Sequence, residues 1–235
     1  MNIPDIIQDV INTMKAFSFS SITQIPATAN FNLVINARDV QYWYVGANCY
    51  LIESGFTFYC TVLAIDEATN TITVTENNAH IFDTRTVTEF GLDINYKHGH
   101  PSDVFDQLNL MAQHPDYKAR RFPVLALMQD FEEDLEAGID ETPIQLILGT
   151  DTQPHFTASE RYTYSFTGRR LTALAARFIA YLETSPYVHF RRAQAEKIDR
   201  LYWGKDGALG NDENKADDLI DAIELNINLK TLNTC

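Results

Sequence analysis

Residues 221–230 read DAIELNINLK and carry the most regular pattern of the chain. Apolar and polar side chains alternate there, in the order Ile223, Glu224, Leu225, Asn226, Ile227, Asn228, Leu229 and Lys230. Successive side chains of a β-strand point to opposite faces of a sheet, so a period of two predicts a strand with one buried and one polar face. The C-terminal part of the chain is therefore expected to end in a sheet that covers a core.

Three further strands are predicted upstream of this one. Residues 122–131 are apolar at every position from Val124 to Met128, which is typical of a central strand that is buried on both faces. Residues 144–150 repeat this pattern, and residues 197–203 form the next predicted strand.

Two helices are predicted with these strands, one before the first pair of strands and one between the two pairs. One is predicted over residues 102–113 with Ser102 as its N-cap, and a longer one over residues 157–184. The longer helix opens with the capping box Thr157-x-x-Glu160. Its apolar stripe consists of Leu171, Leu174, Ala175, Phe178, Ile179 and Leu182. The order helix–strand–strand–helix–strand–strand predicts an α+β layer with the long helix across the sheet.

The N-terminal part of the chain has a different pattern. Strands rich in β-branched and aromatic residues are predicted at Leu33–Val40, Cys49–Ile52, Phe56–Asp66, Thr71–Glu76 and Phe90–Tyr96. Hairpin turns at 53–55 and 66–70 join some of them, and short strands at this spacing predict a small β-barrel-like domain. An amphipathic helix over residues 4–17 is expected to cover a sheet edge.

The composition changes at residues 98–101, His-Gly-His-Pro, which we interpret as a hinge. The predicted domains are therefore residues 1–97, a helix plus a β-barrel-like domain, and residues 98–235, the α+β domain. Within the first domain, the aromatic run 42–44 is expected to contribute to the core and to an interface, because three consecutive side chains cannot share one face of a strand.

Charge is sorted into blocks along the chain. Residues 122–160 hold nine acidic and no basic residues, residues 161–205 hold nine basic against three acidic, and residues 206–235 hold seven acidic against two basic. Surfaces of opposite sign on one chain attract a second copy offset head to tail, which is how rings are built. We therefore predict a subunit interface made by Asp130, Glu132, Glu133, Asp134, Glu136, Arg161, Arg169, Arg170 and Arg177.

The totals exclude several classes of protein. A net charge of −14 disfavours binding to duplex DNA and to anionic membranes. Three cysteines, Cys49, Cys60 and Cys235, are too few and odd in number for a disulfide framework. We expect no membrane segment and no secretion signal, because neither an apolar run of about 20 residues nor a signal pattern is present.

Catalytic and ligand-binding motifs are absent from the sequence. There is no G-x-S-x-G and no G-x-G-x-x-G. His98 and His100 with Asp103 lack the further ligands of a tetrahedral metal site. Acidic clusters at 130–134 and 217–224 are interpreted as solvated loop surfaces and not as acid–base pairs. We therefore expect neither an enzyme nor a bound cofactor or metal.

The order of motifs over residues 98–235 resembles a family of tailed-phage neck proteins. The family is the tail-terminator or head–tail connector type found in phages of the Bacteroidetes, including crAss-like phages. The resemblance depends on Phe122–Leu127 with Asp130 and Phe131, Ile147–Thr150, Thr157-x-x-Glu160-Arg161, Lys197–Gly204 and Asp221–Glu224. The resemblance does not cover residues 1–97, which are an addition relative to this family.

The resemblance implies a virion structural protein that forms a homo-oligomeric ring, sixfold or twelvefold, at the head–tail junction. Its partners would be further copies of itself and the portal, adaptor or tail proteins of the virion. DNA would pass through the lumen without specific binding, and the ring would be assembled in the host cytoplasm.

Two alternatives stay open at the level of the sequence. One is a soluble binding module whose N-terminal barrel captures a peptide or a nucleic acid, although only Arg38 and Arg85 lie between residues 31 and 96 as basic groups for a phosphate-binding groove. The other is an enzyme that uses the clustered carboxylates with a divalent metal.

Overall fold

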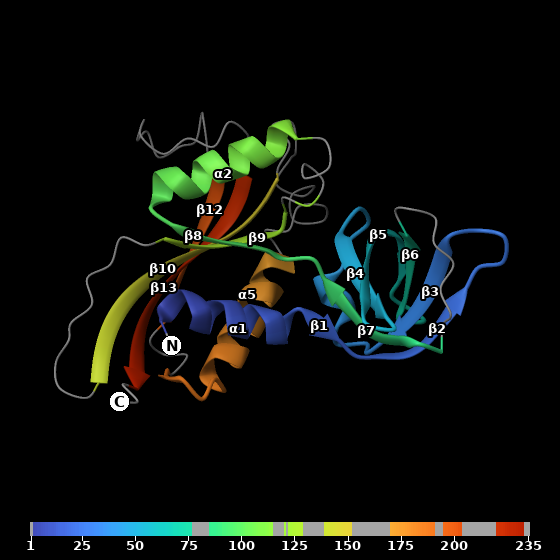
Figure 1. Cartoon of the computed structure of the whole chain (residues 1–235), viewed down its shortest axis with the longest axis horizontal. Helices are drawn as coiled ribbons and strands as arrows, with labels where there is room; N and C mark the ends of the chain where they lie inside the picture. The colour runs from blue at the N-terminus through green and yellow to red at the C-terminus, as the bar shows by residue number, and fades with distance from the viewer. Residues whose placement is uncertain are drawn as a thin grey trace. The chain divides into compact units, whose positions relative to one another are not determined.

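The computed structural model describes residues 2–76, 85–114, 120, 122–128, 139–151, 170–190, 195–203 and 220–232. Over these residues the protein is of the mixed α+β class, as predicted, and strands predominate (Figure 1). It divides into two compact units, Lys15–Asp93 and Met1–Met14 with Ile94–Cys235.

The first unit, Lys15–Asp93, is a seven-stranded antiparallel sheet with the strand order β1-β7-β4-β5-β6-β3-β2. Its strands are β1 (Ala16–Phe17), β2 (Phe19–Gln24), β3 (Asn30–Ile35), β4 (Asn48–Glu53), β5 (Phe56–Asp66), β6 (Thr71–Glu76) and β7 (Val87–Leu92). The two outermost strands, β1 and β2, are separated in the chain by Ser18 alone, so the two edges of the sheet meet there. The sheet is therefore nearly closed into a barrel, as the sequence predicted.

The barrel interior is filled by the inward-facing residues of these strands and by Trp43. In β3, Phe31, Leu33 and Ile35 are buried while the residues between them are half-buried, as a period of two requires. Trp43, just after the short 3-10 helix η1 (Val40–Tyr42), is fully buried and stacks on Phe90 with ring centroids 4.5 Å apart. The predicted core role of the aromatic run is thus confirmed for Trp43.

The structure differs from the predicted elements of this part of the chain. The strands β1 and β2 were not predicted, and the helix expected over residues 4–17 ends at Met14, so that Ala16 and Phe17 lie in β1. The strand expected to reach Val40 ends at Ile35, because the chain turns at Asn36, whose carbonyl accepts a hydrogen bond from the Asp39 amide at 2.8 Å. The strand expected over 90–96 is two strands, β7 and β8, which belong to different units. By contrast, β5 and β6 have the predicted bounds.

The second unit is built on a six-stranded sheet with the order β11-β13-β10-β9-β8, in which β12 also pairs with β13. Its strands are β8 (Asn95–Gly99), β9 (Val124–Met128), β10 (Ile139–Asp151), β11 (Val188–His189), β12 (Ala195–Trp203) and β13 (Ile220–Leu232). Its helices are α1 (Ile3–Met14), α2 (Pro101–Gln113) and α5 (Arg170–Glu183). Among the strand pairs that the structure describes in this sheet, β8 and β9 are parallel and the others are antiparallel.

Helices cover both faces of this sheet. Figure 1 shows α2 on one face and α5, with α1 beside it, on the other. The predicted apolar stripe of α5, from Leu171 to Leu182, is buried at all six positions. The predicted apolar positions of β13, Ile223 to Leu229, are buried as well, and cross-strand partners place them on the same face as Leu146 and Leu148 of β10.

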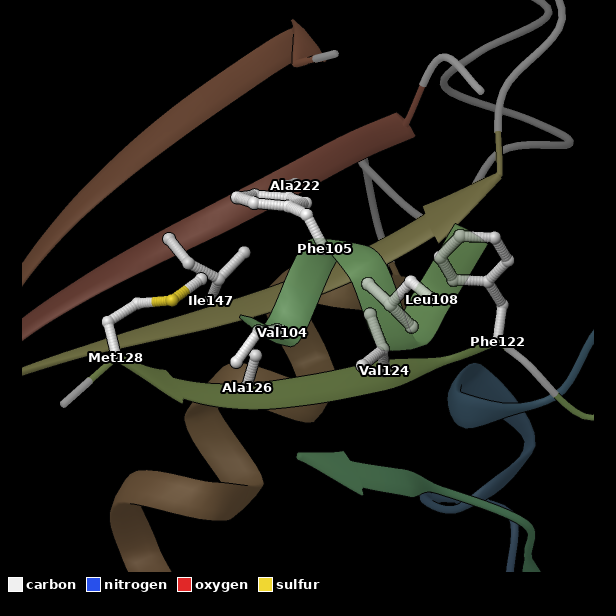
Figure 2. Packing of buried hydrophobic residues seen from close by; sticks show 9 residues of the cluster. All are labelled: Val104, Phe105, Leu108, Phe122, Val124, Ala126, Met128, Ile147 and Ala222. Carbon is white, nitrogen blue, oxygen red and sulfur yellow. The ribbon is translucent and has the colours of Figure 1, made fainter. Parts of the chain in front are cut away.

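The other face carries a separate hydrophobic cluster under α2. Figure 2 shows side chains of α2 pointing onto β9, β10 and β13. The cluster consists of Val104, Phe105, Leu108, Phe122, Val124, Ala126, Met128, Ile147 and Ala222. Because β9 is buried on both faces, the prediction of a central strand there is confirmed.

The division of the chain differs from the predicted boundary at residue 97. The N-terminal helix α1 belongs to the second unit, where the hydroxyl of Tyr96 donates to the Pro4 carbonyl at 3.1 Å. The predicted hinge is also wrong, since His98 and Gly99 lie in β8 and pair with Leu127 and Met128. The last two residues of the predicted hinge, His100 and Pro101, are the N-cap and the first residue of α2.

The N-terminus of α2 is capped by a different side chain from the predicted one. The N-cap is His100 and not the predicted Ser102. The ring of His100 accepts a hydrogen bond from the backbone amide of Ser102. The capping box predicted at Thr157 and Glu160 lies outside the residues that the structure describes, so the described part of the long helix begins at Arg170.

A close contact between β4 and β7 generates a first prediction. Tyr50 lies opposite Gly91, only 5% of it is exposed, and its hydroxyl donates to Glu89 Oε1 at 2.6 Å. A Cβ atom at residue 91 would collide with the Tyr50 ring. We expect Gly91→Ala to lower the free energy of unfolding by about 1–3 kcal/mol, measured by urea denaturation. In a Tyr50→Ser background the same change should cost much less, and an equal cost would refute the contact.

The turn between β5 and β6 generates a second prediction. Asp66 accepts hydrogen bonds from the Thr69 hydroxyl at 2.7 Å and from the Ala68 and Thr69 amides, and these bonds lower its pKa below the ordinary 3.8. Because the folded pKa is the lower one, the contribution to stability is present above the ordinary pKa and is lost as pH falls through the folded value.

The hydroxyl of Thr69 is the first cause of this shift, so Thr69→Val should raise the pKa of Asp66 toward 3.8, as followed by NMR titration of its carboxyl. The control is Thr23→Val on the exposed side of β2. An unchanged Asp66 titration in the Thr69 variant would contradict the assignment.

Candidate subunit interface

Most of the residues predicted for a subunit interface lie outside the described residues. The acidic ones come between β9 and β10, and two of the arginines precede α5. The predicted interface residues outside the described ranges are Asp130, Glu132, Glu133, Asp134, Glu136, Arg161 and Arg169. Their role in an interface stays a prediction.

The structure places the other two arginines on α5. Arg170 is the first described residue of the helix and is half-buried. Arg177 is also half-buried, and its Nε donates to the carbonyl oxygen of Met14 at 2.7 Å. Its guanidinium lies 5.2 Å from the centroid of the Tyr181 ring. Both are off the buried stripe of α5, as the sequence predicted.

The contact of Arg177 is a helix-end interaction inside one chain. Met14 is the last residue of α1, where backbone carbonyls lack helical partners and the helix dipole favours a cation. A guanidinium at that carbonyl therefore ties the end of α1 to the middle of α5. The sequence contains no signal for this bond, because the two residues are far apart in the chain.

The helix α1 is held by three further features. Its buried face consists of Ile3, Ile6, Ile7, Val10, Ile11 and Met14. It contacts both α5 and the edge strand β8. The hydroxyl of Tyr96 on β8 bonds to Pro4, and burial together with the nearby Asp5 carboxylate raises the pKa of that tyrosine. The predicted role of this helix in covering a sheet edge holds only in part, because α1 contacts the outer strand β8 but packs beside α5 on one face of the sheet.

The sheet of the second unit has two outer edges. β8 forms one of them and is contacted by α1 and α2. β11 and β12 form the other, since β10 occupies the opposite side of β13 along its whole length. Glu196 and Lys197 of β12 are exposed, and Ile198 is half-buried. In the described part of the chain, no strand other than β13 pairs with β12.

The carboxylates expected on solvated loops are partly in the sheet. Asp221 and Glu224 lie in β13 and are buried, which corrects the prediction for these two; Asp217 and Asp218 fall outside the described residues. Glu224 Oε1 accepts from Gln145 Nε2 at 2.9 Å and from Asn226 Nδ2 at 3.1 Å.

The positions of Asp221 and Glu224 in β13 keep their carboxylates apart. They are three residues apart on one strand, so they point to opposite faces of the sheet. Two carboxylates on opposite faces cannot act on one substrate. An acid–base pair built from these two groups is therefore excluded by the geometry.

The histidines considered as metal ligands have other positions. His98 is exposed on β8, with its ring centroid 5.7 Å from that of Tyr96. His100 Nδ1 lies 2.7 Å from the Ser102 hydroxyl at the start of α2. Within the described ranges, no three His, Cys, Asp or Glu side chains are grouped so as to hold a metal ion. The same ranges contain no helix with the length and apolar character of a membrane span.

The chain was compared with protein-family models, with curated proteins and with solved structures. No protein-family model matches the chain, no curated protein is similar to it, and no solved structure matches its fold.

The bond between Arg177 and Met14 generates a third prediction. Arg177→Ala removes the cation at the end of α1, and we expect the free energy of unfolding to fall by about 1–3 kcal/mol. Amide hydrogen exchange in residues 3–14 should become faster, because α1 loses one of its attachments. Arg38→Ala, on an exposed turn of the first unit, is the control and should change neither measurement. Unchanged exchange in α1 would show that the bond does not hold the helix.

Proposed function

We propose that this chain is a structural subunit of a tailed-phage virion that forms a homo-oligomeric ring at the head–tail junction, as a connector or tail terminator. The observation that carries the proposal is the sorting of charge, with nine acidic and no basic residues in 122–160 followed by nine basic and three acidic in 161–205. A head-to-tail contact between these two regions of neighbouring copies repeats around a ring and closes it.

The described part of the second unit supports an assembly role in two ways. Its sheet has helices on both faces but leaves two outer strands, β8 and β12, at the edges. Its buried carboxylates Asp221 and Glu224 lie on opposite faces of the sheet, and Glu224 accepts hydrogen bonds from Gln145 and Asn226 within it. Both features suit a rigid body that contacts other copies through its periphery.

The charge of the chain supports a lumen through which DNA passes. The net charge is −14, and the first unit alone, residues 15–93, has three basic residues (Lys15, Arg38 and Arg85) against eight acidic ones. Phosphates are repelled by such a surface at long range, so DNA would slide along it without being trapped.

The first unit is suited to contact a neighbouring ring or an outer tail component. Val45 and Leu63 are 63% and 43% exposed. Val45 precedes Gly46, whose amide donates to the Val62 carbonyl at 2.8 Å, and Leu63 follows Val62. Phe56, at the start of β5, is 72% exposed. Exposed apolar groups of this kind mark contact surfaces when they gather in a patch.

A charge-reversal experiment tests the ring, and this is the fourth prediction. Arg161, Arg169 and Arg170 are changed together to Glu, while Arg177 is left intact because it holds α1. We expect the rings seen by negative-stain electron microscopy, formed alone or on assembled portal, to be lost because acidic surfaces now face each other. Changing Glu132, Glu133 and Asp134 to Lys in the same chain should restore them.

The control for this experiment is Arg38→Glu with Arg85→Glu, which reverses two exposed cations of the first unit and should leave rings intact. Rings that persist in the triple arginine variant would contradict the proposed contact. The location is tested separately with antibodies against this chain, which should label the neck of intact virions. Labelling of the capsid or of tail fibres, or none, would overturn the assignment to the head–tail junction.

A further inference from the structure

The outer strand β12 is a candidate for pairing with a strand of another molecule. It has nine residues, and one of its edges is paired with β13 from Ala195 to Arg200 and again at Trp203, with an irregularity between them. Among the described residues its other edge has no strand beside it. A strand in this position presents a row of backbone amide and carbonyl groups that can pair with a further strand.

The charges along β12 select one kind of partner. Residues 196–200 read Glu-Lys-Ile-Asp-Arg. Residues at equal distance from Ile198 on its two sides therefore carry opposite charges. When two such strands run antiparallel and are centred on Ile198, Glu196 lies opposite Arg200 and Lys197 lies opposite Asp199. Each pair occurs twice by symmetry. Opposite charges directly across an antiparallel ladder are stabilising, and like charges are destabilising.

We propose that β12 pairs antiparallel with β12 of a second copy of this chain, centred on Ile198, so that the two sheets become one continuous sheet across a twofold axis. The contact is isologous, because the same strand is used on both sides, and it closes at two copies. The strand β12 therefore recognises itself.

Other registers of the same two strands are disfavoured by their charges. A shift of one residue in one direction places Glu196 opposite Asp199, and a shift in the other direction places Lys197 opposite Arg200. A parallel arrangement in register places every charge opposite its own kind. Each of these arrangements brings like charges together, whereas the register centred on Ile198 pairs all four charges of each strand with opposite ones.

The other outer strand is a poorer partner for β12. β8 carries a single permanent charge, Lys97, so it can satisfy only one of the four charges of β12. It is also contacted by α1 and α2. A second copy of β12 is therefore the occupant that the charges favour.

This contact goes beyond the proposed ring and uses different residues. The ring contact involves residues 130–136 and 161–170, none of which lies in β12. We expect the twofold dimer to form in the free chain before assembly. Pairing of the two β12 strands then covers an edge that would otherwise pair with other strands. A result that excludes the β12 dimer therefore does not contradict the ring contact, and a result that excludes the ring contact does not contradict the β12 dimer.

The fifth prediction tests the pair by sedimentation equilibrium of the full chain at concentrations up to the order of 100 μM. The parent protein should show a dimer. Arg200→Glu places two carboxylates opposite each other at two symmetric positions and should weaken the dimer on the order of tenfold or more. The double change Glu196→Arg with Arg200→Glu, made in one chain, should restore it. Arg38→Glu makes the same change of charge on an exposed turn and should have no effect.

A cysteine at the centre of the pair tests the register. In a Cys235→Ser background, Ile198→Cys places two thiols opposite each other on the twofold axis, whereas the native Cys49 and Cys60 are buried. Under mild oxidation we expect a covalent dimer to form much faster than with Ala68→Cys on an exposed turn. A monomer at all concentrations, a dimer insensitive to Arg200→Glu, or equal cross-linking of the two cysteine variants would each overturn the proposal.

Discussion

The pairing of β13 with β10 is the constraint on which the second unit depends. β13 is bonded along one edge to β10 from Ile220 to Leu232, and β11 and β12 occupy its other edge. With both edges occupied, the alternation of β13 fixes which side chains meet α5 and which lie on the face of α2. A shift of one residue would turn Glu224 and the asparagines into the core under α5, so the hydrophobic pattern also fixes the register.

The first unit is an insertion into this framework. The chain completes α1, forms the whole barrel between Lys15 and Asp93, and then returns to the second unit at β8. Such an insertion is tolerated when the two ends of the inserted unit leave the host contacts intact. Here α1 keeps its place through the buried apolar face, the Tyr96 hydroxyl and Arg177. The barrel is thus an added module on a unit whose periphery we propose to be used for assembly.

The candidate interface was predictable only in part. The excess of charge in each block is a property of composition, and the position of Arg170 and Arg177 off the apolar stripe follows from a helical period of 3.6 residues. The engagement of Arg177 with Met14 was not predictable, because a bond between residues so distant in the chain leaves no periodic signal. The alternation of residues 223–230 predicted that Glu224 lies in a strand but put it on the polar face, whereas the structure buries both Glu224 and Asp221 in the sheet.

The sequence by itself determined the local periods: the buried stripe of α5, the alternation of β13, the bounds of β5 and β6, and the mirrored charges of β12. It did so because these patterns involve neighbouring side chains, whose spacing on a helix or strand is set by backbone geometry alone. Only the tertiary structure decided that residues 90–96 divide between two units, that α1 joins the second one, and that β12 lies at an edge. Those outcomes depend on contacts between segments far apart in the chain, such as Ala16 with Gly91, and no local pattern specifies them.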